Sequence, residues 1–372
     1  MFGGILTTSI GHCHPRLVEK IQHQSTKIWH TSSLYLTEEI HEFAIKLANH
    51  FPEPLRCVFV CNSGSEANDI AITMSRLYTG SFDIIALRNG YHGSTLSTMP
   101  LCSIGVWKFP MPTSFGFHYA SCPDPYRGRV GGRFCRDSLI QTNRHCDCID
   151  ADHCQAADYY IEDLQTMMDS CLPKKIAAMF AESIQGVGGV VQYPKQYIKR
   201  AYELVKQRNG LMVMDEVQTG FGRIGTNFWE FQSHGILPDI VTMAKGIGNG
   251  FPMAAVITTA EIAQTLTLGS YFNTFGGNPL ASAIGSTVLD VIDENNLQLR
   301  SHNLGNKLLK KLAQIRDDYN GEIVGDVRGK GLMIGVEMMY QGKPMPKDQM
   351  DQIIEDCKDM GLIVGRGGKP FF

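Results

Sequence analysis

The stretch from Val213 to Gly250 constrains the fold more than any other part of the sequence, because two short apolar runs in it each end in a charged residue. The first run ends at Asp215, and the second ends at Lys245. Short apolar runs bounded by glycines are typical of buried strands in a parallel sheet. Because open α/β sheets bind ligands where their strands end, we expect Asp215 and Lys245 to arrive at the same place from neighbouring strands.

A lysine at the end of a buried strand has unusual chemistry. Burial disfavours its charged form and leaves the amine free to act as a nucleophile. A carboxylate beside it could hold a cationic ring nitrogen. These two groups are the least that a protein supplies to pyridoxal phosphate, namely a Schiff-base lysine and an acid on the pyridinium nitrogen. The alternative is that Asp215 and Lys245 form a structural ion pair between two strands.

The residues around these two positions favour the first interpretation. Residues 215–223 are Asp-Glu-Val-Gln-Thr-Gly-Phe-Gly-Arg, and the second run leads into a Lys-Gly pair at 245–246. This pattern resembles the motif of the class III aminotransferases, the ornithine and omega-amino-acid group. The resemblance covers nearly the whole chain and is closest to the alanine–glyoxylate and β-aminoisobutyrate–pyruvate branch. It implies an α/β structure of fold type I, with a mostly parallel central sheet flanked by helices and a smaller α+β C-terminal domain.

Composition agrees with a large folded protein. The 372 residues are 43% hydrophobic, which is enough for a large core and more than one domain. We expect a large cofactor-binding domain over 1–285 and an incomplete small domain over 286–372. Net charge is −3 and basic runs are short, so we expect neither nucleic acid nor membrane as a partner. Eleven cysteines, an odd number in so large a chain, favour a reducing compartment.

The two ends of the sequence look like the inside of a fold rather than like termini. Residues 1–6 and 361–368 are rich in glycine and apolar residues, and similar members of the family extend further at both ends. We therefore expect a fragment, a splice form or a partial gene model. No Arg-rich leader follows Met1, so a mitochondrial location is implied by the resemblance alone, with the cytoplasm as the alternative.

A turn of small residues, 62–66, separates an expected strand at 56–60 from an expected helix that follows it. Free N–H groups at a helix N-terminus bind anions, and small residues let the backbone approach a phosphate closely. Ser and Gly also cap helices where no ligand binds, so the turn by itself is weak evidence. The resemblance assigns the cofactor phosphate to Gly64 and Ser65 and gives Glu66 a supporting role.

Tyr91 and His92 follow an expected strand at 84–87. An aromatic residue in such a turn can stack on a flat ring. The resemblance places Tyr91 on the pyridine face of the cofactor, with His92 in support; an aromatic side chain packed under a loop is the alternative.

An expected strand at 176–181 ends at Glu182, which the resemblance places in the cofactor site. Proline is common in the family at the next position, where this chain has Ser183, and we expect that departure to loosen the turn. Gln218 is expected to hydrogen-bond to the phenolic oxygen of the cofactor. The alternative is a loop glutamine whose hydrogen bonds are all made within the protein.

Three further residues concern the substrate and the neighbouring subunit. In members of the family that use a distal amine, the position of Val187 is often Glu, which pairs with an arginine near the C-terminus. Valine cannot form this pair, so the arginine is free to bind the carboxylate of a small α-keto acid. Arg328, in an expected glycine-flanked turn, could clamp such a carboxylate, although a solvated turn arginine is the alternative. Thr274 matches a family threonine that reaches the phosphate of the neighbouring subunit, which implies a homodimer or a higher homo-oligomer. In a simpler interpretation that can also hold, the segment contains only a helix cap at Asn278.

Helical and strand periodicity fades over residues 109–158, where Cys122, Cys135, Cys146, Cys148 and Cys154 gather. We interpret this region as a long surface insertion that carries reduced thiols, and the same branch of the family has a similar Cys-rich insertion. A zinc site is the alternative. Because paired C-x-x-C elements are absent from the sequence, we predict no metal site.

The resemblance implies pyridoxal 5′-phosphate as cofactor and small amino acids and α-keto acids as substrates. An amino group would move from alanine or a β-amino acid to glyoxylate or pyruvate through a Schiff base on Lys245. The freed lysine would then transfer a proton as a general acid–base, while Asp215 keeps the ring nitrogen protonated. A phospho-lyase acting on amino-alcohol phosphates, or an aminomutase, would share these cofactor residues. A truncated form without catalytic activity is a further alternative.

Overall fold

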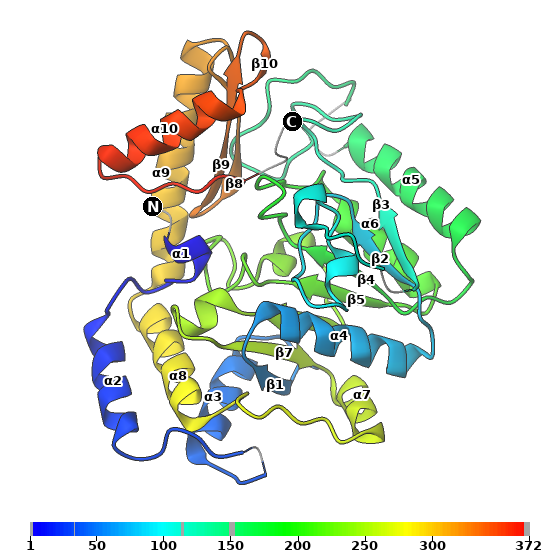
Figure 1. Cartoon of the computed structure of the whole chain (residues 1–372). Coiled ribbons are helices and arrows are strands. Elements are labelled where there is room, and N and C mark those ends of the chain that lie inside the picture. The colour runs from blue at the N-terminus through cyan, green and yellow to red at the C-terminus, as the bar shows by residue number, and fades with distance from the viewer. Residues whose placement is uncertain (1–2, 33, 113–114, 149–152, 368–372) are drawn as a thin grey trace.

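The structure is a computed structural model that describes residues 3–32, 34–112, 115–148 and 153–367. A seven-stranded sheet with helices on both faces forms the larger unit, and a three-stranded sheet with two helices forms a smaller unit beside it (Figure 1). This arrangement confirms the α/β class that the sequence predicted.

The large sheet is mostly parallel. Its strands follow the order β1 (Cys57–Cys61), β7 (Ala254–Thr258), β6 (Ile240–Met243), β5 (Leu211–Asp215), β4 (Ala178–Glu182), β2 (Ile84–Leu87) and β3 (Phe117–Ala120). Strand β7 runs antiparallel to both of its neighbours, β1 and β6, whereas the pairs among β6, β5, β4, β2 and β3 are parallel. Strands β5 and β6 are adjacent, which confirms the expectation that Asp215 and Lys245 come from neighbouring strands.

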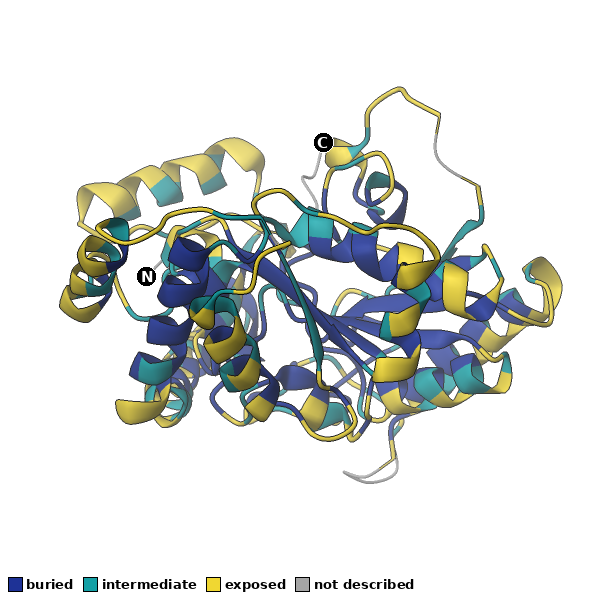
Figure 2. Cartoon of the chain, turned by 90° about the horizontal axis from the view of Figure 1, so that it is seen from below, coloured by how far each residue is buried: buried dark blue, intermediate teal, exposed yellow. Residues whose placement is uncertain are grey.

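The inner strands are apolar on both faces because helices cover both. Met212 and Met214 of β5 belong to one hydrophobic cluster, and Leu211 and Val213 belong to the other. Alternate residues of a strand point to opposite faces, so a nearly continuous apolar run fills two cores at once. The view from below shows the buried strands crossing the molecule, with helices that expose their outer sides (Figure 2).

Helices of the larger unit surround this sheet. They are α1 (Gly3–Leu6), α2 (Pro15–Ser25), α3 (Glu38–Asn49), α4 (Gly64–Thr79), α5 (Gln155–Cys171), α6 (Tyr197–Gln207), α7 (Ala260–Ala263) and α8 (Pro279–Glu294). Short 3₁₀ turns are η1 (Met99–Leu101), η2 (Gly105–Trp107), η3 (Glu230–His234), η4 (Lys245–Gly248) and η5 (Gln264–Leu268). The cap expected at Asn278 is confirmed, because its Oδ1 accepts a hydrogen bond from the Ala281 N–H at 2.9 Å.

Helix α6 begins later than the sequence suggested. Proline is favoured in the first turn of a helix, which makes Pro194 the candidate in the sequence for opening α6. Instead, Pro194 forms an isolated β-bridge with Arg136, and Gln196 has a left-handed φ of 66°. The left-handed residue breaks the helical path, so the first helical residue is Tyr197. Side-chain periodicity does not report such a bridge, because the bridge depends on a distant segment.

The smaller unit contains α9 (Leu297–Asp318), β8 (Val324–Lys330), β9 (Met333–Tyr340), β10 (Lys343–Pro344) and α10 (Lys347–Asp359). Its antiparallel sheet has the order β10-β9-β8, and α9 packs against β8. The domain boundary expected at 285–286 falls inside α8, which packs against α2 and α3 of the larger unit. Among the described residues, no helix is both long and apolar enough to span a membrane.

Candidate active site

A cavity of about 290 Å³ lies where strands β4, β5 and β6 end. Eight of the nine cofactor residues expected from the sequence line it: Gly64, Ser65, Tyr91, His92, Glu182, Asp215, Gln218 and Lys245. They come from five separate segments that the sheet brings to one edge. Thr274 and Arg328 do not line this cavity. The structure therefore brings together eight of the expected cofactor residues but not the expected substrate-binding arginine.

Asp215 is buried at the end of β5 and is held from three sides. Its Oδ2 lies 2.8 Å from His92 Nδ1 and accepts a hydrogen bond from Asn68 Nδ2 at 2.9 Å, and its Oδ1 accepts one from the Val217 N–H at 3.0 Å. Burial disfavours the carboxylate, but the His92 contact and these donors together lower its pKa. Asp215 is therefore a fixed negative charge inside the cavity.

Lys245 begins η4, two residues beyond the end of β6, and its φ of 48° is in the left-handed region. That strained conformation turns the chain sharply at the lysine. Burial lowers the pKa of the amine, while the charges of Asp215 and Glu182 oppose the shift. Lys245 and Asp215 border the same cavity, and the lowered pKa of the amine agrees with the expectation of a poorly hydrated lysine near an acid.

The turn before α4 is built to leave its backbone accessible. Ser63 caps the helix, because its Oγ accepts a hydrogen bond from the Glu66 N–H at 3.2 Å. Beside it, Gly93 has a φ of +124°, and a Cβ there would lie 2.5 Å from Ser65 Oγ. Two turns therefore meet closely at this end of the 16-residue helix, where free N–H groups favour an anion.

Glu66 links this turn to the loop that contains Thr274. Its Oε2 accepts hydrogen bonds from Asn62 Nδ2 and Asn273 Nδ2, both at 2.9 Å. Thr274 itself is exposed and does not line the cavity of this chain. Its expected contact with a neighbouring subunit stays a prediction.

Glu182 ends β4 directly beside Asp215 in the sheet register. Its two carboxylate oxygens accept hydrogen bonds from the N–H groups of Tyr91 at 3.0 Å and Gly186 at 2.7 Å. Burial raises its pKa to about 7, although the nearby His92 charge opposes this shift. Glu182 therefore ties the Tyr91 turn to the end of β4.

Tyr91 and Gln218 face the same cavity from opposite loops. The Tyr91 ring lies tilted against Trp107, with ring centroids 5.4 Å apart. Gln218 packs so closely over Gly186 that a Cβ on this glycine would lie 2.1 Å from Gln218 Oε1. Both side chains are thus positioned by their neighbours, and their expected contacts with a cofactor stay predictions.

The loosening expected at Ser183 is not seen. Ser183 is buried, and its hydroxyl donates a hydrogen bond to Glu216 Oε1 at 2.5 Å. Glu216 also accepts hydrogen bonds from the Thr219 hydroxyl and from the Phe231 N–H. A proline could not supply this donor, so the serine connects the end of β4 to the loop after β5.

Arg328 lies within β8, not in a turn, because β8 continues to Lys330 before the chain reverses. It borders a separate cavity of about 650 Å³. Its guanidinium donates to Gly189 O at 2.6 Å, to Glu337 Oε2 at 2.9 Å and to Asp326 Oδ2 at 3.2 Å. The alternative of a solvated turn arginine is therefore wrong, while a role in substrate binding stays a prediction.

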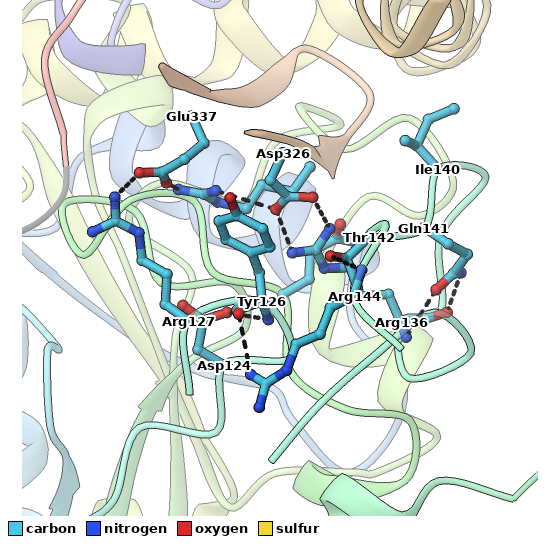
Figure 3. Close-up of polar contacts among 12 residues, drawn as sticks. Asp124, Tyr126, Arg127, Arg136, Ile140, Gln141, Thr142, Arg144, Asp326 and Glu337 are labelled. Atoms are coloured by element: carbon cyan, nitrogen blue, oxygen red, sulfur yellow. Dashed lines mark hydrogen bonds and ion pairs between the residues drawn. The ribbon is translucent and has the colours of Figure 1, made fainter. Parts of the chain in front are cut away.

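The carboxylates that hold Arg328 are shared with the insertion. Glu337 also pairs with Arg127, and Asp326 also pairs with Arg136 (Figure 3). These contacts connect the smaller unit to the segment between β3 and α5.

Comparison with known proteins identifies the family. Residues 1–371 match the family model described as aminotransferase class-III. The chain belongs to the class III aminotransferases. It is 54% identical to human mitochondrial alanine–glyoxylate aminotransferase 2, over 98% of this chain and 71% of that protein. It is 43% identical to a mitochondrial homologue of the same enzyme from Arabidopsis thaliana, over 99% of this chain and 72% of that protein.

Solved structures of this class share the fold. An amine transaminase from an uncultivated Pseudomonas species, in a pyridoxal-phosphate-bound form, superposes with a TM-score of 0.87 at 27% identity, over 99% of this chain and 83% of that one. A phospholyase from Arthrobacter, in complex with phosphoethanolamine, superposes with a TM-score of 0.84 at 28% identity, over 97% of this chain and 81% of that one. Fold similarity alone thus covers enzymes of more than one reaction type.

The residues of this class III chain fit the cofactor that the family implies. The cavity offers a half-buried amine on Lys245, a buried carboxylate on Asp215 and a helix N-terminus at Gly64 for a phosphate. At Gly93 the neighbouring turn comes so near Ser65 that no larger side chain could be accommodated without a shift. The three chemical groups of the cofactor therefore each meet a suitable partner.

Sequence reasoning missed one residue that the class III site depends on. Asn68 is buried in the first turns of α4 and donates to both Asp215 Oδ2 and the carbonyl oxygen of His92. Its own Oδ1 accepts a hydrogen bond from Thr242 Oγ1 at 2.8 Å. The available signal was a polar residue on the helix face formed by Ala67, Ile70 and Ala71.

Proposed function

We propose that this chain is a pyridoxal-phosphate-dependent transaminase that moves an amino group from alanine or a β-amino acid to glyoxylate or pyruvate. One observation carries the proposal. The amine of Lys245, the carboxylate of Asp215 and the N-terminus of α4 border a single cavity. The identity to human alanine–glyoxylate aminotransferase 2 supports the choice of substrates.

When bound, pyridoxal phosphate supplies an electron-withdrawing ring that stabilises negative charge on the substrate carbon. Asp215 keeps a proton on the ring nitrogen, and its position is fixed by His92 and Asn68. Gly64 and Ser65 hold the phosphate through backbone N–H groups at the start of α4. Tyr91 covers one face of the ring, and Gln218 donates to the phenolic oxygen.

Lys245 anchors the cofactor through its Nζ and then transfers a proton at that atom. Burial lowers the pKa of this amine, so a larger fraction of it is uncharged and able to attack a carbonyl carbon. With the cofactor bound, the free Nζ would accept the proton from the substrate α-carbon and would deliver it to the C4′ carbon of the cofactor.

The choice of a small keto acid is supported by Val187, which carries no charge into the loop after β4. That loop also supplies the Gly189 carbonyl that binds Arg328. We propose that Arg328, released from Glu337 or Asp326, binds the substrate carboxylate. We further propose a mitochondrial homo-oligomer in which the exposed Thr274 reaches the neighbouring cofactor phosphate; the names of the human and Arabidopsis relatives support the compartment.

The test is an assay of the purified chain loaded with pyridoxal phosphate. Alanine and glyoxylate should yield pyruvate and glycine, and borohydride treatment should leave the cofactor on the peptide that contains Lys245. Binding of the cofactor without any amino transfer from alanine or a β-amino acid would contradict the proposal.

A second candidate is a phospho-lyase, favoured by the fold shared with the Arthrobacter enzyme that was solved with phosphoethanolamine. The same preparation should be given phosphoethanolamine. Release of inorganic phosphate, in the absence of pyruvate formation from alanine, would select this alternative.

A further inference from the structure

The segment between β3 and α5 is long and has little regular structure. Among its described residues, 121–148 and 153–154, neither a helix nor a strand occurs; Arg136 forms only an isolated bridge. Long segments of this kind are uncommon in compact domains unless they are functional or otherwise ordered. Yet this segment is firmly held at one point, where the buried Arg136 guanidinium pairs with both oxygens of Asp326 at 2.6 and 3.0 Å (Figure 3).

Three thiols of the segment converge next to Arg136. The sulfur atoms of Cys135, Cys148 and Cys154 all lie within 4.8 Å of one another, and Cys135 and Cys154 are buried. They come from three places in the segment, including the residue that directly precedes α5. The fold, rather than sequence adjacency, brings them together.

The sulfur spacing matches a shared metal ion better than a disulfide. Cys135 Sγ and Cys148 Sγ are 3.9 Å apart. A disulfide would bring the two sulfur atoms to about 2.05 Å. Two thiolates on one tetrahedral zinc ion, each with a Zn–S bond of about 2.3 Å, are about 3.8 Å apart. The observed separation, which also fits an S–H···S hydrogen bond, is compatible with two ligands of one zinc ion and not with a disulfide.

A fourth thiol is available from Cys146, two residues before Cys148. Cys135 and Cys146 line the same cavity. Gly132 lets this cysteine come close, because a Cβ on the glycine would lie 2.1 Å from Cys146 Cβ and 2.8 Å from its Sγ. Cys135, Cys148 and Cys154 thus supply three converging thiols. Cys146, outside that cluster but in the same cavity as Cys135, is placed to move in as the fourth ligand of a closed structural zinc site.

The surroundings suit the negative charge of four thiolates. The Gln155 N–H donates to Cys148 Sγ at 3.3 Å, and Cys154 is the N-cap of α5, whose 17 residues direct their dipole toward it. Arg129 and Arg144 line the cavity that contains Cys135 and Cys146. Hydrogen bonds to ligand atoms and nearby cations are the outer contacts that support metal sites.

We propose that Cys135, Cys146, Cys148 and Cys154 bind one structural Zn²⁺ ion. Each bound sulfur is a thiolate, so binding releases the protons of the four thiols and forms four Zn–S bonds, with no change in oxidation state. The ion fastens the insertion to the start of α5 and holds Arg136 against Asp326 of β8. The spacing of the cysteines had favoured reduced surface thiols over zinc; the convergence of the sulfur atoms favours zinc.

The test begins with the metal content of the full chain, expressed with zinc and purified with its cofactor. Elemental analysis should find one zinc ion per chain. The Cys148→Ser and Cys154→Ser variants should lose it. The matched control is Cys171→Ser, at the exposed far end of α5, which should keep the ion. Absence of zinc from the parent chain, or its retention in both ligand variants, would overturn the proposal.

A second measurement needs no variant to fold. The unsubstituted chain, stripped of metal under reducing conditions, should be titrated with Co²⁺ alone. Tetrahedral thiolate coordination should give an intense visible d–d band and a sulfur-to-cobalt charge-transfer band that saturate together. A featureless or octahedral spectrum would overturn the proposal, as would a Cys135–Cys148 disulfide mapped in the native protein by mass spectrometry.

Discussion

The cofactor cavity and the Cys-rich insertion both gather reactive side chains from distant positions, but they do so by different means. In the cavity, Glu182 and Asp215 end two adjacent strands, and Lys245 follows a third. In the insertion, the thiols lie on a segment with no described helix or strand until α5 begins. Sheet register positions the first group, whereas the path of the loop and its contacts position the second.

The two regions also differ in how firmly their backbones are held. Backbone hydrogen bonds between β4, β5 and β6 fix the strand ends from which Glu182 and Asp215 project. The insertion has no such ladder, so its order depends on side-chain links such as Arg136–Asp326 and on the proposed zinc ion. Loss of one side chain should therefore affect chemistry in the first region and structural integrity in the second.

The largest expected effect is that of Lys245→Ala on catalysis. Without the nucleophile and proton carrier, transamination should fall by at least on the order of 10³-fold, and borohydride should trap no cofactor on the chain. Steady-state kinetics and peptide mass spectrometry measure both. The exposed Lys27→Ala is the matched control. A trapped adduct in Lys245→Ala would move the nucleophile to another residue.

Asp215→Ala should reduce turnover by about two to three decades, because the ring nitrogen loses the acid that keeps it protonated. Asp215→Asn, which keeps the size of the side chain and one of its two acceptor oxygens, should show a similar loss of rate. Both variants should still bind the cofactor, as visible absorbance would report. Near-normal turnover would contradict the assigned role.

Arg136→Met should destabilise the chain by about 3 kcal/mol, because it leaves the buried Asp326 carboxylate without its bidentate partner. Urea unfolding gives the free energy, and hydrogen exchange should show that the insertion opens first. Arg133→Met, at an exposed position of the same segment, is the control. Equal stability of the two variants would show that the ion pair does not anchor the insertion.

The last expected effect, which is small within any one pH unit, is a pH dependence from Glu216. Burial raises its pKa from an ordinary 4.5 to about 7. Between these two pH values the folded chain keeps a proton that the unfolded chain has released, so stability falls as the pH rises, by up to about 1.4 kcal/mol per pH unit. Glu216→Gln should reduce this slope in urea unfolding and leave the part that Glu182, whose pKa is also raised to about 7, contributes.

The control for this slope is the exposed Glu203→Gln, which should leave it unchanged. If Glu216→Gln keeps the full slope, another carboxyl, such as Glu182 with its pKa also raised to about 7, accounts for the titration.

Much of the cavity could be predicted from sequence because its residues stand at the ends of apolar runs. The run before Asp215 and the run before Lys245 became neighbouring strands, as expected. Asn68 was missed because one polar residue on an apolar helix face has many explanations, and only its contact with Asp215 selects one. Arg328 was expected in a turn, but its pairing with Gly335 extends the strand past it.

By itself the sequence determined the α/β class and the chemical groups at the strand ends, because period and spacing translate directly into position within a sheet. The family followed from the resemblance of residues 215–223 and 245–246 to the class III motif. Only the tertiary structure decided that Ser183 donates a hydrogen bond to the buried Glu216. The same holds for the sulfur atoms of Cys135, Cys148 and Cys154, which lie within 4.8 Å of one another. Those contacts join residues from separate loops or from different parts of one loop, and spacing along the sequence does not report which loop residues meet. Their geometry depends on how loops pack, which is settled only when the whole chain has folded.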